Sequence, residues 1–362
     1  MSKKKLAIIG SFPLPITGEA ICNELIGHKL KNHYDILIIN TALNKKIDKP
    51  GKFSFNKMFS QFRGYMKLGE LLSCDIIYMT PGQTLLGIIR FLPYIYASIV
   101  FKKTSILHFH GSSIPNVIVN APFALRLILI KTISRVKKVI TLSNSIDTEF
   151  KEKLNINNTV VVNNYVSNEF VHQCKPKSRN KEVLKVLYLS NLIPEKGIFE
   201  VVEATKNLLG NNYSLQLEIA GSVPDDIEQQ FYSAIQDQSC IQFHSIVTGK
   251  NKVDLYLSAD VFVLPSYYPI EGVPLTILEA MAAGCIIIST TQGGIVDVVK
   301  HNENGFIVRK RNSEDIENAI INVIKMDEKD FNSVSLANQN KIMKEYSENH
   351  FLSEIQNVLE LR

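Results

Sequence analysis

Two glutamates, Glu271 and Glu279, lie eight residues apart where an apolar strand pattern gives way to a helical one. The strand pattern ends at Pro265, and Pro274 suits the first turn of the following helix. Glu279 lies inside that helix among apolar residues, so it needs a partner if it is buried. A helix N-terminus offers free N–H groups and a positive dipole end to anionic or hydroxyl-rich ligands. The segment therefore indicates a ligand site, although a helix-start charge is an alternative role for Glu271.

A Lys–Gly pair, Lys196-Gly197, follows another strand pattern and opens a helix. A cation at a strand end would stabilise a diphosphate leaving group as its charge develops. The alternative is a surface lysine in front of a glycine-initiated helix. Near the N-terminus, Thr17-Gly18 opens a helix whose N–H groups suit a phosphate, or it forms an ordinary loop. This loop lacks the GxGxxG pattern, which argues against an NAD enzyme.

Two histidines, His108 and His110, close a further strand pattern. Strand alternation puts both side chains on one side, with His110 nearer the strand end. We expect His110 to hydrogen-bond a ligand at this strand end, and a structural role is the alternative. The five cysteines are scattered without a CxxC pair, which argues against a disulfide framework or a zinc site and favours a reducing compartment. No Asp-x-Asp motif stands at a predicted strand end, so we expect no metal ion. We expect Lys196 and backbone N–H groups to provide the positive charge that a metal ion would otherwise supply.

Short β-branched runs alternate with helical patterns along the whole chain. The predicted strands are 6–9, 36–39, 76–79, 106–109, 139–142 and 160–162, then 184–189, 215–220, 241–243, 261–264, 286–289 and 306–308. The predicted helices include 19–30, 55–72, 197–209 and 274–283. Buried runs separated by helices predict parallel sheets, and two such series predict two doubly wound domains. Ligands bind outside the carboxyl ends of such strands, so we expect the site in a cleft between the domains.

The polar, proline-containing stretch 172–181 separates the two series. We therefore expect an N-terminal Rossmann-like domain over 1–174 and a C-terminal Rossmann-like domain over 182–340. The segment 341–362 is predicted to be a C-terminal helix that packs back on the N-terminal domain.

The net charge of +5 is unevenly distributed, with +13 over residues 1–175 and −8 over residues 176–362. A basic half suits a nucleic acid, an acidic glycan or an anionic membrane, or it is a solvated lysine face. No nucleic-acid motif is present. The apolar stretch 84–101 contains Arg90 and Pro93, which favours a buried or membrane-surface helix over a membrane span. The stretch 123–138 mixes apolar and basic residues and predicts either membrane contact or a buried core helix.

The run from Glu271 to Gly284 resembles the Glu-x7-Glu signature of family 4 retaining glycosyltransferases, and 292–299 and 304–308 resemble the segments that follow it there. This resemblance implies an α/β protein of the GT-B fold, with two doubly wound Rossmann-like domains facing across a cleft. It implies that the domain over 1–174 is acceptor-binding and that the domain over 182–340 is nucleotide-sugar-binding. It also implies that Glu271 contacts hydroxyls of the transferred sugar and that Glu279 binds the ribose hydroxyls of the nucleotide.

The resemblance extends to the other candidate residues. Lys196 matches the lysine of the family's phosphate-binding loop, and His110 matches its sugar-binding histidine. Asn191 stands where the family usually has an arginine, and Glu19 follows Gly18 where two glycines are common; asparagine offers neither charge nor a guanidinium fork. The candidate catalytic residues are Glu271, His110 and Lys196, and the candidate donor-binding residues are Gly18, Asn191, Lys196, Gly272, Val273, Pro274, Leu275 and Glu279.

We therefore expect a retaining, metal-independent hexosyltransferase that moves a sugar from a nucleoside-diphosphate sugar to a glycan or lipid-linked acceptor. Its expected setting is bacterial cell-surface polysaccharide biosynthesis, in the cytoplasm and in peripheral contact with the inner face of the cytoplasmic membrane. No cofactor is expected beyond the donor substrate. Two alternatives stay open: a non-catalytic nucleotide-sugar-binding partner subunit, which Asn191 favours, and a nucleotide-sugar epimerase of the same architecture.

Overall fold

The computed structural model describes residues 3–14, 17–42, 64–177, 182–236 and 238–361. By its contacts the chain forms two compact units, one of residues 1–162 with 352–362 and one of residues 163–351. The division falls at Val162, ahead of the polar stretch 172–181. The predicted domain limits at 174, 182 and 340 stay a prediction.

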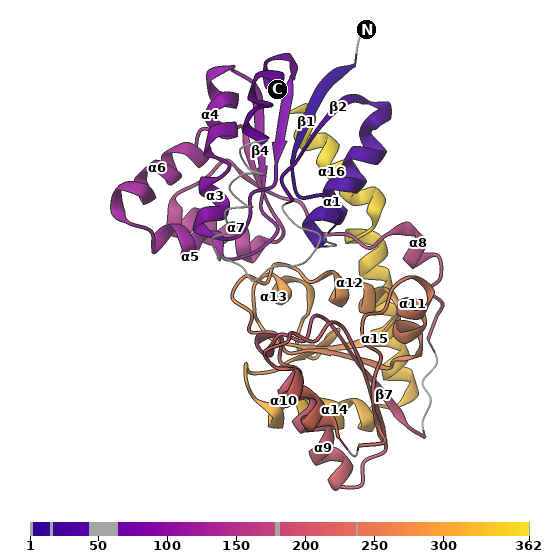
Figure 1. The fold of residues 1–362 in the computed structure, drawn as a ribbon. Coiled ribbons are helices and arrows are strands. Elements are labelled where there is room, and N and C mark those ends of the chain that lie inside the picture. The colour runs from indigo at the N-terminus through magenta and orange to yellow at the C-terminus, as the bar shows by residue number, and fades with distance from the viewer. Residues whose placement is uncertain (1–2, 15–16, 43–63, 178–181, 237, 362) are drawn as a thin grey trace. The chain divides into compact units, whose positions relative to one another are not determined.

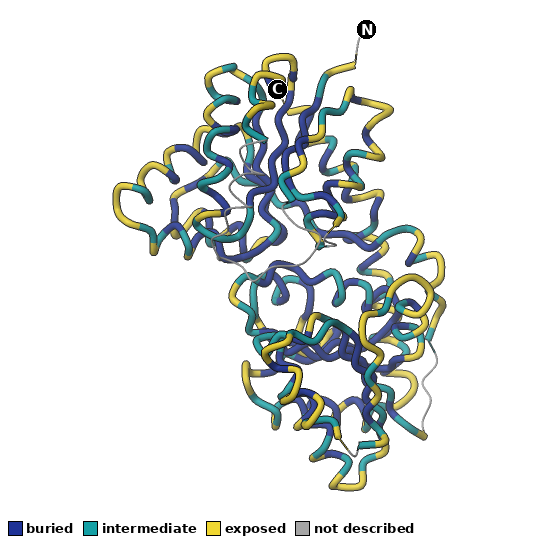
Figure 2. The backbone as a smooth tube through the Cα atoms, viewed as in Figure 1, coloured by how far each residue is buried: buried dark blue, intermediate teal, exposed yellow. Residues whose placement is uncertain are grey.

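The first unit contains a parallel sheet of six strands in the order β2-β1-β3-β4-β5-β6 (Figure 1). The strands are β1 (Lys4–Gly10), β2 (Tyr34–Asn40), β3 (Ile76–Met79), β4 (Thr104–His108), β5 (Lys138–Thr141) and β6 (Thr159–Val161). In the register, Leu6 of β1 is paired with Ile36 and Ile76. The inner strands are buried on both faces (Figure 2), which is why they are continuous apolar runs in the sequence.

Helices cover both faces of this sheet, with α1 on one side and α3 to α7 on the other (Figure 1). The described helices are α1 (Gly18–Lys29), η1 (Leu30–Asn32), η2 (Leu68–Ser73), α3 (Leu85–Ile89), α4 (Leu92–Val100), α5 (Ile114–Val119), α6 (Phe123–Ile133) and α7 (Asn144–Leu154). Side chains of Thr17, Thr84 and Ser143 cap α1, α3 and α7 by accepting hydrogen bonds from backbone N–H groups. The predicted helix 55–72 falls partly on 55–63, outside the described residues.

Two predictions about apolar stretches require correction. The stretch 84–101 forms two short helices rather than one, because Pro93 lacks the N–H that would continue α3 and instead occupies the first turn of α4. The interpretation of Phe123–Ile133 as a buried core helix is wrong, since only one side of α6 is buried and Phe123 is mostly exposed. Over the described part of the chain, no helix combines the length and apolar character needed to cross a membrane.

The second unit also contains a six-stranded parallel sheet, in the order β12-β11-β10-β7-β8-β9. The strands are β7 (Leu184–Leu189), β8 (Leu215–Ala220), β9 (Ile241–Phe243), β10 (Val261–Leu264), β11 (Ile286–Ser289) and β12 (Gly305–Ile307). Counted within the unit, this is the 3-2-1-4-5-6 order of dinucleotide-binding folds. The order in which successive strands are added reverses between β7 and β10, and such a switch point is where these sheets bind ligands.

Among the helices of this unit, α9 packs against α14 and α12 packs against α15. The helices are α8 (Asn168–Val171), η3 (Pro194–Lys196), α9 (Ile198–Gly210), α10 (Glu228–Ile235), α11 (Gly249–Ser258), α12 (Leu275–Ala282), α13 (Ile295–Val298), α14 (Ser313–Lys325) and α15 (Glu328–Glu345). After a break at Tyr346-Ser347, α16 (Glu348–Glu360) follows and crosses into the first unit at Leu352. The tail from 341 is therefore two helical pieces rather than one.

Candidate active site

The loops that follow β7 and β10 meet at the switch point of the second sheet. The Tyr267 amide donates a hydrogen bond to the Glu195 carbonyl at 2.7 Å, which ties one loop to the other. Gly197 has φ +82°, and a Cβ there would overlap Pro265. Glycine is therefore required at this position, both for the left-handed conformation and for the close approach of the two loops.

A lysine and a glutamate are paired where these loops meet. Lys196 Nζ lies 2.8 Å from Oε2 and 3.1 Å from Oε1 of Glu271, and the two side chains are only 14% and 8% exposed. Ser266 Oγ donates a further hydrogen bond to Glu271 Oε2 at 2.7 Å. The Lys196 ammonium also lies 5.4 Å from the centroid of the Tyr268 ring. The structure thus brings together two predicted site residues that are far apart in the sequence, as a shielded ion pair.

The backbone of Glu271 and Gly272 is held by the loop after β11. Gly294 N donates to the Gly272 carbonyl at 2.9 Å. Gly293 has φ +55°, and a Cβ there would overlap the carbonyl oxygens of Glu271 and Gly272. The two glycines that follow Gln292 therefore serve to position the catalytic candidate Glu271.

Glu279 of α12 has two partners on α11. Lys252 Nζ lies 2.6 Å from Oε1, and Tyr256 Oη donates to Oε2 at 3.0 Å. Burial, and then the Glu279 carboxylate, hold the pKa of Tyr256 well above its usual value, so Tyr256 is a permanent donor at neutral pH. The expectation that Glu279 needs a partner is confirmed. Sequence reasoning missed Lys252 and Tyr256, whose spacing of one helical turn was the available signal.

The remaining donor-binding candidates, Gly272, Val273, Pro274 and Leu275, lead into α12. Pro274 precedes the helix, which begins at Leu275, and Asn164 Nδ2 donates to the Val273 carbonyl at 2.8 Å. The first amides of a helix have no partner within it. The amides of Leu275 and Thr276, the first two of α12, therefore have no partner within the helix, which suits an anionic group.

Asn191 lies at the end of β7, outside the ion pair. Its Oδ1 accepts a hydrogen bond from Ser222 Oγ at 3.0 Å, across the ends of β7 and β8. The side chain is exposed and uncharged at neutral pH. Asn191 therefore adds no positive charge to that of Lys196.

In the first unit, Gly18 is the first residue of α1. The next residue, Glu19, is hydrogen-bonded to residues that follow β1 and β3. Glu19 Oε1 accepts hydrogen bonds from Ser11 N at 3.1 Å and Thr80 Oγ1 at 2.9 Å. Burial raises the pKa of Glu19 while these two bonds oppose the rise. Asn23 Nδ2 donates to the Ser11 carbonyl and to Thr80 Oγ1 as well. Glu19 thus fixes the loop after β1 to the end of β3, a role the sequence did not suggest.

His108 and His110 lie at the end of β4 with their ring centroids 4.0 Å apart, which confirms that both point to one side. His108 is buried, and its Nδ1 lies 2.5 Å from Tyr78 Oη. Burial lowers the pKa of His110 to about 3 and that of His108 well below its usual value. Both imidazoles are therefore neutral at pH 7. His110 and Gly18 belong to the first unit, and the other candidate residues to the second.

Comparison with known proteins adds a family pattern to this geometry. Residues 172–347 match the model of the family "Glycosyl transferases group 1". The matched segment contains Lys196, Glu271 and Glu279. It does not contain His110 or Gly18.

Two curated relatives carry names from polysaccharide assembly. The chain is 27% identical to the amylovoran biosynthesis glycosyltransferase AmsK of Erwinia amylovora over 185 residues, 49% of this chain and 44% of the relative. It is 29% identical to the UDP-Gal:alpha-D-GlcNAc-diphosphoundecaprenol alpha-1,3-galactosyltransferase of Escherichia coli over 160 residues, 43% of this chain and 40% of the relative. The matches thus span less than half the length of either relative.

A solved structure matches almost the whole chain. The Anabaena protein Alr3699/HepE, solved in complex with UDP, superposes with a TM-score of 0.74 at 16% identity, covering 98% of this chain and 99% of that one. The same protein with UDP-glucose superposes with a TM-score of 0.73. Together with the two six-stranded parallel sheets, this likeness shows that the chain has the GT-B fold.

Proposed function

We propose that the protein is a glycosyltransferase that moves a sugar from a nucleoside-diphosphate sugar to a glycan or lipid-linked acceptor. The observation that carries this proposal is the shielded Lys196–Glu271 pair at the switch point of the second sheet, within the segment that matches group 1 glycosyl transferases. The donor is a UDP-sugar in the first instance, in line with the UDP and UDP-glucose complexes of Alr3699/HepE.

Each polar group at the site has a part in binding this donor. Glu279, oriented by Lys252 and Tyr256, accepts hydrogen bonds from the ribose hydroxyls. The ammonium of Lys196 and the amides at the start of α12 bind the diphosphate, whose negative charge both complement. Glu271, with Lys196 and Ser266 on its oxygens, accepts hydrogen bonds from hydroxyls of the sugar.

The chemistry follows from where the charge develops. When the bond from the anomeric carbon to the diphosphate breaks, negative charge grows on the leaving phosphate, and Lys196 stabilises it. The acceptor attacks the oxocarbenium-like carbon from the same face, and its proton passes to the leaving phosphate. This route retains the anomeric configuration and requires no side-chain base and no metal. NMR of the product's anomeric configuration tests it, and inversion would refute it.

Donor binding provides the test of the site. We expect Glu279→Ala to weaken binding of the preferred nucleoside-diphosphate sugar roughly 10- to 100-fold, because hydrogen bonds to a charged group contribute about 1.5–3 kcal/mol. A panel of nucleotide sugars and free nucleotides, screened by thermal shift and then titrated calorimetrically, measures the effect. Asp254→Ala is the matched control, since Asp254 is an exposed carboxylate on α11. Equal binding by Glu279→Ala and the wild type would remove Glu279 from the donor site.

The non-catalytic partner subunit is the second candidate, and Asn191 favours it. An asparagine bonded to Ser222 supplies none of the phosphate-binding charge of an arginine. This candidate predicts donor binding without turnover, so it is separated from the first by an activity measurement and not by binding.

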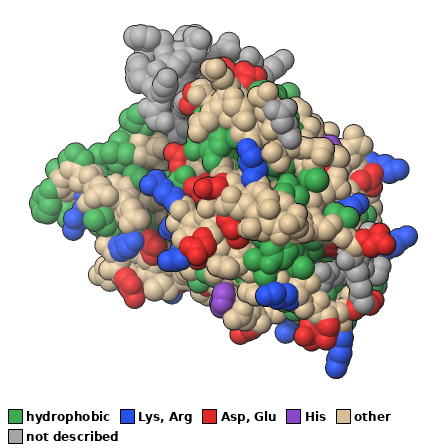
Figure 3. Space-filling model, turned by 90° about the horizontal axis from the view of Figure 1, so that it is seen from below, with side chains coloured by type: hydrophobic (Ala, Val, Ile, Leu, Met, Phe, Trp, Pro, Cys, Tyr) green, Lys and Arg blue, Asp and Glu red, His purple; other side chains and the backbone are tan. Residues whose placement is uncertain are grey.

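A membrane-bound acceptor is supported by the outer face of α6. Phe123, Leu127 and Ile128 of this helix are 74%, 50% and 47% exposed. Figure 3 shows hydrophobic side chains gathered on the projection at the left, the side on which Figure 1 places α6. Arg126 and Lys131 lie on the same helix. We therefore propose that the first unit contacts an anionic bilayer peripherally, at the inner face of the cytoplasmic membrane, and takes a lipid-linked acceptor from it.

Vesicle sedimentation checks this contact. We expect binding to vesicles that contain anionic lipid, and at least a tenfold loss of it in the triple variant Phe123→Ser, Leu127→Ser, Ile128→Ser, because each large apolar side chain buried contributes about 1.5–3 kcal/mol. Binding should also fall with salt, since each nearby Lys or Arg contributes roughly 1 kcal/mol. Leu336→Ser, at an exposed leucine of α15, is the control. The proposal would be wrong if the fraction of protein that sediments with vesicles depended neither on the anionic lipid content nor on the triple substitution.

A further inference from the structure

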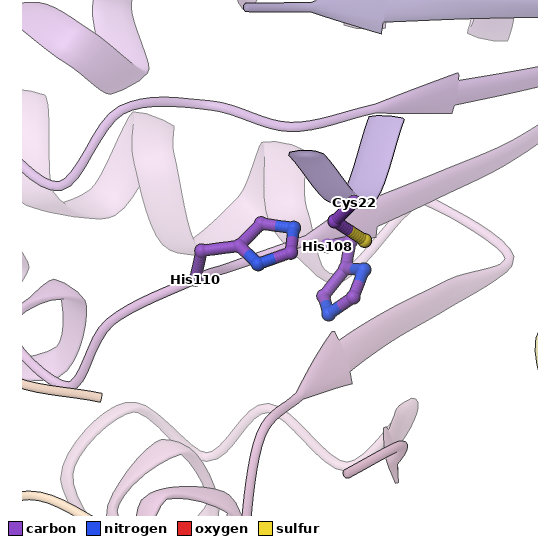
Figure 4. A group of neighbouring side chains, drawn as sticks. All are labelled: Cys22, His108 and His110. Atoms are coloured by element: carbon purple, nitrogen blue, oxygen red, sulfur yellow. The ribbon is translucent and has the colours of Figure 1, made fainter. Parts of the chain in front are cut away.

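Three potential metal ligands converge in the first unit (Figure 4). They are Cys22 of α1, His108 at the end of β4, and His110 two residues further on. The sulfur of Cys22 and one ring nitrogen of each histidine all lie within 4.8 Å of one another. Cys22 and His108 are buried, and His110 is partly exposed.

The histidines of this cluster have nitrogen atoms without a use in the fold. Nε2 of His108 and Nε2 of His110 are both buried, and neither has a hydrogen-bond partner among the described residues. Buried polar atoms are normally satisfied, so each of these nitrogens calls for a partner that the described residues do not provide. A neutral imidazole keeps a lone pair on one of its two ring nitrogens, and that nitrogen can bind a cation.

Tyr78 organises two of the three residues. Its hydroxyl lies 2.5 Å from Nδ1 of His108, which fixes the orientation of that ring. The same hydroxyl is close enough to the Cys22 thiol to favour its ionised form by hydrogen bonding, against the burial that raises the pKa of the thiol. Hydrogen bonds of this kind to the ligands are typical of protein metal sites.

We propose that Cys22, His108 and His110 bind a Zn²⁺ ion. One thiolate and two imidazoles are ligands that suit zinc, and the cluster offers no carboxylate for Mg²⁺ or Ca²⁺. Small side-chain rotations must bring the atoms to typical bond lengths of about 2.0–2.1 Å for nitrogen and about 2.3 Å for sulfur. Binding replaces the proton on Cys22 sulfur by zinc and releases that proton to solvent. Three protein ligands leave a fourth position open for water.

One consequence rests on the proposed function. His110 is the residue we expect to contact a substrate, and a nitrogen that binds zinc is no longer free to bond a sugar hydroxyl. Zinc and substrate should therefore compete at His110, and loading with zinc should raise the apparent KM or abolish activity.

The site is tested by metal binding itself, which does not depend on the activity. We expect the reduced, chelator-treated full-length protein to bind one equivalent of Co²⁺ with the absorption of a thiolate-to-cobalt charge transfer, and Zn²⁺ to displace it. Cys22→Ala should lose that absorption and bind at least roughly 100-fold more weakly, since even indirect contacts to a metal contribute 10- to 100-fold. Cys74→Ala is the matched control, because Cys74 is a second buried cysteine of the same unit and is bonded to the Glu70 carbonyl.

Two further measurements keep the test decisive. Cys22→Ser preserves the side-chain volume if Cys22→Ala is poorly folded, and His108→Ala and His110→Ala should each weaken Co²⁺ binding. A wild-type protein without the charge-transfer band, or one whose band survives Cys22→Ser, would overturn the proposal. Donor binding measured on the metal-free protein separates this failure from a failure of the proposed function.

Discussion

Glu271→Gln is expected to lower kcat by roughly 10²- to 10³-fold, the effect typical of removing one preorganised electrostatic group from an active site. The amide keeps the shape of the carboxyl group but loses its charge. It therefore breaks the ion pair with Lys196 Nζ at 2.8 Å and weakens the bond from Ser266. The measurement is the steady-state rate of nucleoside diphosphate release with the preferred donor.

A matched change separates chemistry from general damage. Glu228→Gln removes an exposed carboxylate at the start of α10 and should leave kcat unchanged. The thermal midpoint of Glu271→Gln should show that the variant is folded. Wild-type turnover by a folded Glu271→Gln variant would mean that the Lys196–Glu271 pair is structural.

Gly293→Ala is expected to reduce activity strongly and to lower the free energy of unfolding by about 1–3 kcal/mol, as strained backbone positions do. Gly293 has φ +55°, and the added Cβ would overlap the carbonyl oxygens of Glu271 and Gly272. The backbone of Glu271 and Gly272 must shift to make room for the added Cβ. Activity should therefore fall further than the smaller fraction of folded protein alone would explain. Chemical denaturation and turnover, measured on the same preparation, give the two quantities.

Gly210→Ala is the control for this backbone effect. It lies at the end of α9, and nothing stands within 4 Å of the Cβ that the substitution adds. Its stability should be unchanged or raised by up to about 1 kcal/mol, because alanine narrows the unfolded ensemble. If Gly293→Ala and Gly210→Ala changed activity and stability to the same extent, the contact between Gly293 and the Glu271 backbone would not explain the loss of activity.

The strands could be predicted from the sequence with good accuracy. The predicted ranges 184–189, 215–220 and 261–264 coincide with β7, β8 and β10. Parallel strands buried on both faces must be continuous runs of apolar, largely β-branched residues, so the sequence marks their limits directly. The position of Lys196 and Glu271 at neighbouring strand ends followed from the same pattern.

The partners of the site residues could not be predicted in this way. Lys252 binds Glu279 only because of how α11 and α12 pack, and no local pattern encodes that packing. Glu19 was known only as a departure from a glycine pair, and its bonds to Ser11 and Thr80 depend on the register of β1 with β3. Cys22 lies close to the two histidines only because of the tertiary packing of α1 near the end of β4. The spacing of these three residues in the sequence therefore does not indicate a metal ligand set.

The exposure of α6 likewise depends on tertiary structure. An apolar helix with few charges fits a core position and a membrane-facing position equally well by sequence. Only the placement of Leu129, Thr132 and Ile133 against the rest of the unit shows which side is left uncovered.

The most direct test of the central claim is nucleoside diphosphate release by the purified wild-type protein, with the donor selected by the binding panel and lipid-linked glycan acceptors in anionic vesicles. The account predicts release that depends on the acceptor and is abolished by Lys196→Ala. A donor that binds with Glu279-dependent affinity, but is not turned over with any acceptor, would contradict the claim of catalysis and identify the chain as a nucleotide-sugar-binding partner subunit.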